Sequence, residues 1–256
     1  MVEDRSGVKS LNLALDVIEA VAAASEDIGV TELASRLGLT KATVFRHLQT
    51  LVERNYLAQD SRTTRYRLGL QCQLLAQLGS NQVDLHSASE EAAHWLRDQT
   101  GLSVAVSTVR ARSVVVLSMV AAPTPVQIGV RPGSSLSLHS SAQGRVALAF
   151  GSSALQNFAR KQEFAASTDH TLTGWDRLEA HIAQVRVQGW SDAPEQLALG
   201  LNAVAAPIFN GNDECIGTIA VVGLIQDLPR TPHPQVTHAV MVAASRVSTI
   251  LGYQKP

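Results

Sequence analysis

The stretch GLTKATVFRHLQTL, residues 38–51, predicts an amphipathic helix behind a tight turn. Gly38 tolerates the left-handed backbone conformation in which helices often end, and Thr40 is a residue type that caps the helix after it. Apolar residues then recur at the spacing of one helix face, at Val44, Leu48, Leu51 and Val52. We expect this helix to run from about residue 41 to residue 55. Alone, the pattern fits an ordinary core helix as well as a DNA-reading helix.

Two helical patterns precede this stretch. The first begins near Ser10, a residue type suited to the N-cap, and has apolar residues three or four positions apart at Leu11, Leu15, Ile18 and Ala22. The second begins at Thr31, and its small Ala34 permits the close approach that a helix-turn-helix needs where its helices cross. We therefore expect three helices, of which the last two form a helix-turn-helix.

A basic hairpin follows the third helix. Short β-prone runs at residues 56–58 and 65–68 flank a polar turn, which completes the layout of a winged helix-turn-helix. The chain has a formal net charge of −1, but residues 36–67 contain seven Lys or Arg against Glu53 and Asp60. A solvated face would show the same balance, so charge alone leaves both interpretations open. Charge and helix pattern together favour a DNA-binding domain.

The outer face of the third helix carries short polar and cationic side chains that can reach base edges and phosphates. Arg46 is the best candidate for a bidentate contact with guanine, and Thr43 could meet a thymine methyl group or a phosphate. The hairpin tip suits contact with the DNA backbone or the minor groove. The expected DNA-binding residues are Lys41, Thr43, Arg46, His47, Thr50, Arg62, Thr63, Thr64 and Arg65.

The sequence changes after Gly101, where Val-rich strands separated by turns begin. A hydrophobic content of 45% supports a second packed core. We expect strands at residues 102–110, 113–121, 125–130, 203–209 and 215–224, and helices at about 84–99, 139–150, 153–164, 174–188 and 236–251. The predicted fold class is α+β, with a winged helix-turn-helix domain at residues 1–69, a linker helix at residues 70–82, and a mainly antiparallel sheet with helices on one or both faces at residues 83–256.

Several classes of protein are disfavoured by what the sequence lacks. Two distant cysteines form neither a disulfide framework nor a zinc cluster, and the eight histidines show no metal-ligand spacing. No apolar run approaches the roughly 18 residues of a membrane span, and the polar start of the chain has no secretory signal. We therefore expect no metal, no cofactor, no membrane association and a cytoplasmic location.

Two interpretations of the second domain remain open at this point. One is a ligand-binding or hydrolytic enzyme domain fused to a DNA-binding module, although GWSDA lacks the final glycine of a nucleophile elbow. The other is a structural DNA-binding protein without an effector, which would not need so large and Val-rich a second domain.

The chain resembles the isocitrate-lyase-regulator (IclR) family of bacterial transcription factors over nearly its whole length. The segments that carry the resemblance are SLNLALDVIEAVA, VTELASRLGLTKATVFRHLQTLVERNYL, RYRLG, LSLHSSAQGRVALA, VRVQGWSDAPEQLALGLNAVAAPIF and GTIAVVG. The resemblance implies a winged-helix domain, a linker helix and an α/β effector-binding domain of the GAF or profilin type. It implies a regulator and not an enzyme, a repressor more than an activator, which binds a palindromic double-stranded DNA operator as a homodimer or a dimer of dimers. The first helix and the linker helix are the expected dimer contacts.

The resemblance places a pocket for a small-molecule effector where a helix begins, at residues 139–143. Unpaired N–H groups and the helix dipole there favour an anion, although Ser140 or Ser141 could simply cap the helix. The expected effector-binding residues are Leu138, His139, Ser141, Ala142, Gln143, Trp190, Ala193, Leu201, Ala203, Ala220 and Val222.

Some of these positions depart from the common pattern of the family. Ala193, Ala203, Ala220 and Val222 stand where many relatives carry an acid, a cysteine or serines. An apolar wall offers little to a very small acid such as glyoxylate or pyruvate. We therefore expect an aromatic or otherwise hydrophobic carboxylate, with its anionic end near residues 139–143. Trp190 fits a core position better than a pocket wall.

Overall fold

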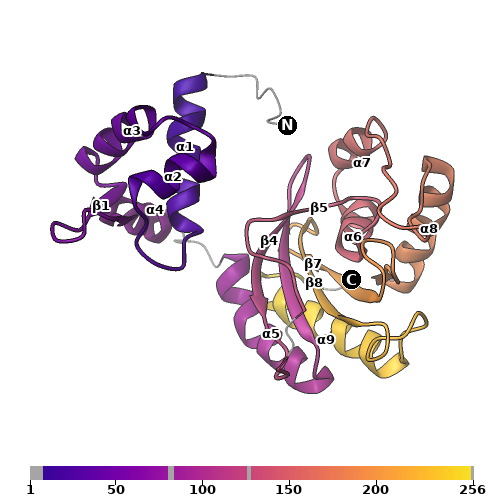
Figure 1. The fold of residues 1–256 in the computed structure, drawn as a ribbon. Helices are drawn as coiled ribbons and strands as arrows, with labels where there is room; N and C mark the ends of the chain where they lie inside the picture. Colours follow the sequence, from indigo (N-terminus) through magenta and orange to yellow (C-terminus); the bar gives the residue numbers. More distant parts are fainter. Residues whose placement is uncertain (1–7, 80–83, 126–127, 255–256) are drawn as a thin grey trace. The chain divides into compact units, whose positions relative to one another are not determined.

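The computed structural model describes residues 8–79, 84–125 and 128–254. The chain divides into two compact units, residues 1–82 and 83–256 (Figure 1). Each unit has its own buried core. Within the described ranges, no helix is long and apolar enough to cross a membrane.

The first unit contains a three-helix core, a hairpin and a further helix. Its elements are α1 (Lys9–Ala22), α2 (Val30–Leu37), α3 (Lys41–Glu53), β1 (Leu57–Gln59), β2 (Tyr66–Leu68) and α4 (Leu70–Gly79). Gly38 ends α2 in the left-handed conformation, with φ of 65°. The Thr40 side chain accepts a hydrogen bond from the Thr43 backbone N–H at 3.2 Å and so caps α3. These features confirm the helix-turn-helix and the hairpin that the sequence predicts.

Helix α1 differs from the prediction in its cap, and its buried residues lie beside the predicted apolar stripe. Val8 occupies the N-cap position, so Ser10 lies inside the helix. Leu11 and Leu15 are 58% and 47% exposed, whereas Val17 is fully buried against α2 and α3. The core of this unit takes Val17 and Val21 from α1, and Ile18 of the predicted stripe packs against it. Leu11 and Leu15 of that stripe are left uncovered in the single chain.

Helix α4 begins as part of the first unit. The backbone N–H of Gln71 donates to the Asn55 carbonyl at 2.9 Å, and the Cys72 thiol donates to the Tyr56 carbonyl at 3.2 Å. Its side chains Leu70, Leu74 and Leu75 are exposed. The predicted boundary between the winged helix-turn-helix domain and the linker helix, at residues 69 and 70, therefore falls within a hydrogen-bonded turn.

The second unit is built on one antiparallel sheet. Its elements are α5 (Leu85–Thr100), β3 (Ser103–Val109), β4 (Val114–Val120), β5 (Ser135–Leu136), α6 (Ala142–Phe150), α7 (Ser153–Ala159), α8 (Trp175–Gln188), β6 (Ser191–Asp192), β7 (Leu201–Phe209), β8 (Cys215–Leu224) and α9 (Pro234–Ile250). The strand order is β5-β4-β3-β8-β7-β6, and each neighbouring pair is antiparallel. This confirms the predicted fold class.

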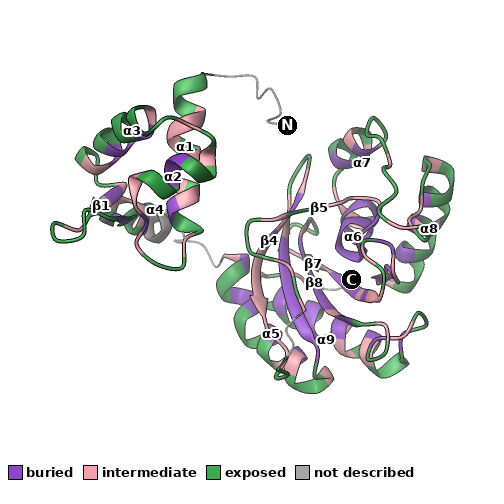
Figure 2. Ribbon diagram, in the orientation of Figure 1, coloured by how far each residue is buried: buried purple, intermediate pink, exposed green. Residues whose placement is uncertain are grey.

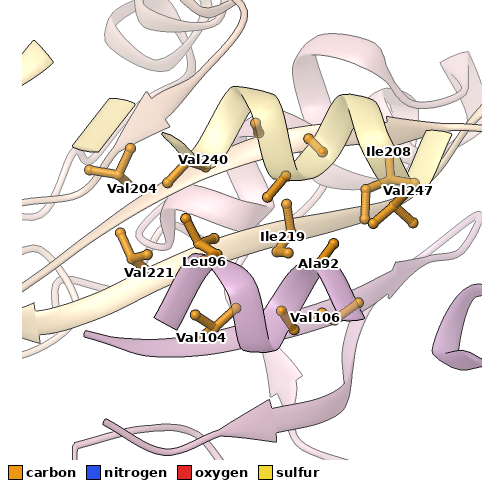
Figure 3. Packing of buried hydrophobic residues seen from close by; sticks show 14 of the residues in the cluster. Ala92, Leu96, Val104, Val106, Val204, Ile208, Ile219, Val221, Val240 and Val247 are labelled. Carbon is orange, nitrogen blue, oxygen red and sulfur yellow. The ribbon is translucent and has the colours of Figure 1, made fainter. Parts of the chain in front are cut away.

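Helices cover both faces of this sheet. On one face, Leu96 of α5 and Val240 of α9 pack against residues such as Ile219 of β8 (Figure 3). On the other face, α6 and α8 pack against Ala205 and Ala220. Figure 2 shows the buried residues gathered on the central strands and on the inner sides of the flanking helices.

The irregular segments depart from the prediction. Residues 128–130 of the expected strand 125–130 are not a strand, and residues 126–127 lie outside the described ranges. Two edge strands of two residues each, β5 and β6, were not predicted because such short strands show no alternation. The helix expected at 139–150 begins only at Ala142, because the Ser141 side chain caps it there. The helix expected at 153–164 ends at Ala159, where the chain tightens into a turn.

Candidate functional site

Among the described residues of the first unit, the outer face of α3 borders a hollow. Val44 and Leu48 are fully buried on the inner side. Thr43, Arg46, His47 and Thr50 line a hollow of about 370 Å³ together with Ser10 and Leu13 of α1. Lys41 is exposed in the first turn of the helix, outside this hollow. The sequence-predicted residues of α3 therefore share the solvent side of the helix.

The cations on this face are uncommitted. Among the described residues, the side chains of Lys41 and Arg46 form no ion pair or hydrogen bond. By contrast, Arg36 on α2 is paired with Glu32 at 2.7 Å. A cation without a protein partner on the outer face of a helix is suited to a phosphate or a guanine edge.

The tip of the hairpin is held in shape by Asp60. Its carboxylate accepts hydrogen bonds from the backbone N–H groups of Thr63 at 2.8 Å and Arg62 at 2.9 Å, and these bonds lower the pKa of the Asp60 carboxyl. Thr64 takes a left-handed conformation with φ of 57°. Arg65 is placed differently from expectation, since its guanidinium donates to the Asp27 carbonyl at 2.6 Å and braces the hairpin against the body of the unit.

The second unit contains a cavity of about 280 Å³ between the start of α6 and the loop at residues 193–200. It is smaller than two surface hollows of about 430 and 520 Å³ on the same unit, but its wall includes the first turn of α6. The lining is almost entirely apolar. The lining residues are Ile128, Gly129, Val130, Leu136, Ser140, Ser141, Ala142, Gln143, Ala193, Leu197, Ala198, Leu201, Asn202, Ala203 and Val222.

The structure brings most of the expected effector-binding residues to this cavity. Those that line it are Ser141, Ala142, Gln143, Ala193, Leu201, Ala203 and Val222. Residues 128–130 and 197–198 were missed because they lie in irregular segments, where no periodic pattern marks a buried wall. Leu136, Ser140 and Asn202 also line the cavity and were not in the expected set.

The other expected residues lie elsewhere, each for a packing reason. Trp190 packs with the α5–α9 cluster on the opposite face of the sheet. The His139 ring hydrogen-bonds to the Ala165 carbonyl at 3.1 Å, and its centroid lies 4.9 Å from that of Phe164. Leu138 and the fully buried Ala220 belong to the core between the sheet and α6.

The two serines before α6 have different roles. The Ser141 hydroxyl donates to the Ser137 carbonyl at 2.6 Å and accepts from the Gly144 N–H at 2.9 Å, so it caps the helix. The hydroxyl of Ser140, a cavity-lining residue that is 1% exposed, has no hydrogen-bond partner among the described residues. The backbone N–H groups of Ala142 and Gln143, in the first turn, likewise donate to no described acceptor. The start of α6 thus offers uncommitted donors beside the cavity.

A fully buried arginine lies behind this turn. The Arg145 guanidinium donates to the His139 carbonyl at 2.8 Å, to the Asp192 carbonyl at 3.1 Å and to the Gln196 side-chain oxygen. It therefore joins the segment before α6 to the loop on the far side of the cavity. Burial lowers the pKa of Arg145 to about 10, against the opposing effect of Asp192, so it stays charged at neutral pH.

This cation affects its titratable neighbours. Burial raises the pKa of the Asp192 carboxyl, although Arg145 opposes that rise. Burial, with the field of Arg145, lowers the pKa of His181 to about 4, so the imidazole is neutral at pH 7. The N-terminal end of the α6 dipole, with its unpaired N–H groups, favours an anionic ligand at the start of this helix.

The loop at residues 193–200 is held by hydrogen bonds at its turn. Thr168 donates to the Glu195 carbonyl at 2.6 Å, and Thr171 donates to the Gln196 carbonyl at 2.7 Å. Glu195 also forms an ion pair with Arg230. The cavity wall that this loop supplies is therefore preorganised. In the part of the chain that the structure describes, no three His, Cys, Asp or Glu side chains gather as a metal site requires.

Comparison with known proteins gives matches to both units. The model of the IclR helix-turn-helix domain matches residues 10–61, and that of the bacterial transcriptional regulator IclR C-terminal domain matches residues 79–249. The glycerol operon regulatory protein of Streptomyces coelicolor is 28% identical over 250 residues, which is 96% of this chain and 97% of that protein.

Solved structures share the fold. An IclR homologue from Microbacterium hydrocarbonoxydans, crystallised with 4-hydroxybenzoate, superposes with a TM-score of 0.79 at 18% identity and covers 94% of this chain and 98% of that one. The IclR regulator of Alicyclobacillus acidocaldarius gives a TM-score of 0.77 at 23% identity, over 95% and 98% of the two chains.

Proposed function

Because the chain belongs to the IclR family of bacterial transcriptional regulators, we propose that it controls transcription from a palindromic operator in response to an aromatic or otherwise hydrophobic carboxylate. It is a DNA-binding regulator with an effector-binding C-terminal domain, and not an enzyme. We place it in the cytoplasm, where the operator is, and expect it to act as a repressor.

The observation that carries the effector class is the composition of the cavity wall. Ala193, Ala203 and Val222 present only methyl and isopropyl groups, whereas the start of α6 offers uncommitted donors. A volume of about 280 Å³ lies just below the roughly 300–1,000 Å³ of small-molecule pockets, which suits a small ligand. A single-ring acid, with its carboxylate at the start of α6 and its ring against the alanines, fits both features. The Microbacterium homologue holds a ligand of this class.

Calorimetry tests this assignment. Benzoate-type acids should bind the wild-type protein, whereas pyruvate should give no measurable heat of binding. An Ala203→Phe variant fills the cavity from β7 and should lose the aromatic acids. Clear binding of pyruvate without binding of any aromatic acid would refute the proposed effector class.

The proposed operator-binding form is a homodimer. Leu11 and Leu15 on α1, and Leu70 and Leu75 on α4, are large apolar side chains that are 47% to 62% exposed. Such faces usually mark a protein contact. Pairing through them would let two copies of α3 enter successive major grooves, roughly 34 Å apart. Further pairing of the effector domains would give a dimer of dimers.

Replacing Arg46 with Ala should weaken binding to the operator by about 1–3 kcal/mol, because the guanidinium is assigned to a guanine edge. Fluorescence anisotropy with operator and scrambled duplexes measures both affinities. Arg36→Ala is the matched control, since it removes the same charge from α2 and should weaken both duplexes equally. An equal loss on both duplexes in Arg46→Ala would reduce Arg46 to a phosphate contact.

A further inference from the structure

Gln143 is an unusual residue for the wall of an apolar cavity. It occupies the first turn of α6, is only 4% exposed, and lines the cavity among alanines, leucines and valines. A buried primary amide is costly unless its donors and acceptor are paired. The partners of each Gln143 atom therefore matter for what the cavity can hold.

One end of this amide is committed to the sheet. Gln143 Nε2 donates to the backbone carbonyl of Ala105, on β3, at 3.2 Å. A carbonyl oxygen can only accept, so this contact fixes which end of the amide is nitrogen and which is oxygen. Ala105 lies in the middle of the sheet, paired with Ala220 of β8, so the anchor is rigid.

The other end of the amide is uncommitted. Gln143 Oε1 accepts no hydrogen bond from the described residues. Of the other polar side chains that line the cavity, Ser141 and Asn202 donate elsewhere, and the Ser140 hydroxyl has no partner among the described residues. The Ser141 hydroxyl donates to the Ser137 carbonyl, and the Asn202 amide donates to the Leu228 and Pro229 carbonyls. The cavity wall thus presents a fixed acceptor without a donor.

We propose that Gln143 Oε1 is a specificity determinant that selects effectors carrying a hydroxyl, or another hydrogen-bond donor, in addition to their carboxylate. This inference rests on the proposed function of the cavity. The carboxylate takes the uncommitted donors at the start of α6, and the hydroxyl of the ligand donates to Gln143 Oε1. A ligand without a donor leaves this acceptor desolvated and unpaired, and a site built in this way discriminates against it.

The test is a titration of matched ligands into matched variants. Calorimetry compares benzoate, the three hydroxybenzoates and the three corresponding methoxybenzoates, because the position of the hydroxyl on the ring is not fixed in advance. In the wild type, at least one hydroxybenzoate should bind about tenfold more tightly than benzoate and than its own methyl ether. In Gln143→Leu and Gln143→Met, which keep the side-chain bulk without the acceptor, this preference should fall to within about twofold while benzoate still binds.

The readout is the preference for the hydroxyl and not the absolute affinity. If Gln143 had only a structural role, its replacement would change the absolute affinity but not this preference. Denaturation followed by tryptophan fluorescence shows whether each variant is folded. Two variants are used so that the test can still be made if one of them does not fold. Retention of the hydroxyl preference in both variants, or its absence in the wild type, would overturn the role of Gln143 while leaving the cavity assignment intact. If no acid of the series binds the wild type, the proposed effector class fails first and this inference fails with it.

Discussion

In an Arg145→Met variant, the free energy of unfolding of the second unit should be about 3–5 kcal/mol lower than in the wild type. The substitution keeps the volume of a long side chain but removes the charge and all the donors of the guanidinium. The His139 and Asp192 carbonyls lose a buried hydrogen bond, and Gln196 keeps only the Leu172 N–H as a donor to its side-chain oxygen. Buried acceptors without partners carry their full desolvation cost.

Urea denaturation followed by tryptophan fluorescence measures this loss. The three tryptophans of the chain, Trp95, Trp175 and Trp190, all belong to the second unit, so the signal reports on that unit alone. Arg177→Met is the control, because Arg177 is exposed on α8 and its loss should change stability by less than about 0.5 kcal/mol. Equal stability of the Arg145 and Arg177 variants would show that the buried arginine does not hold the cavity walls together.

In a Gly144→Ala variant, the free energy of unfolding should fall by about 3 kcal/mol or more, although helix propensity alone predicts a gain. Alanine would normally stabilise a helix by about 1 kcal/mol relative to glycine. Here an added Cβ would lie 2.7 Å from the Leu138 Cα and closer still to the Ser137 carbonyl oxygen. Both are backbone atoms of the segment on which α6 packs, so the helix would have to move away.

The same fluorescence assay checks this prediction. Gly211→Ala is the control, since its nearest neighbouring atom would be the Gly252 carbonyl oxygen at 3.3 Å, in a loop that can shift. A gain in stability for Gly144→Ala would contradict the close approach of α6 to residues 137–138. The tight contact also explains why a glycine precedes Arg145 in the segment that resembles the family.

The regular elements could be predicted because their patterns depend on local spacing. Gly38, Thr40 and the apolar face of α3 occur as the sequence indicates, since turn, cap and helix face are each set within a few residues. Leu11 and Leu15 belong to the predicted apolar face of α1, yet both are exposed. Periodicity shows that a face is apolar but does not show what covers it.

The candidate cavity could be predicted only in part. Residues on β7 and at the start of α6 were expected from the resemblance to the family, and the structure places them on the wall of the cavity. The lining from residues 128–130 and 197–198 comes from loops, where side-chain direction depends on tertiary contacts. The different roles of Ser140 and Ser141 also depend on a contact with Ser137 that no spacing rule indicates.

The central claim is that an acid in the cavity changes the affinity of α3 for its operator. The most direct measurement is the anisotropy of labelled operator DNA, obtained by selection from random duplexes, with and without a saturating benzoate-type acid that calorimetry shows to bind. We predict a change in operator affinity of about fivefold or more for the wild type and none for the cavity-filling Ala203→Phe variant. Operator affinity that stays the same at saturating acid would contradict the claim.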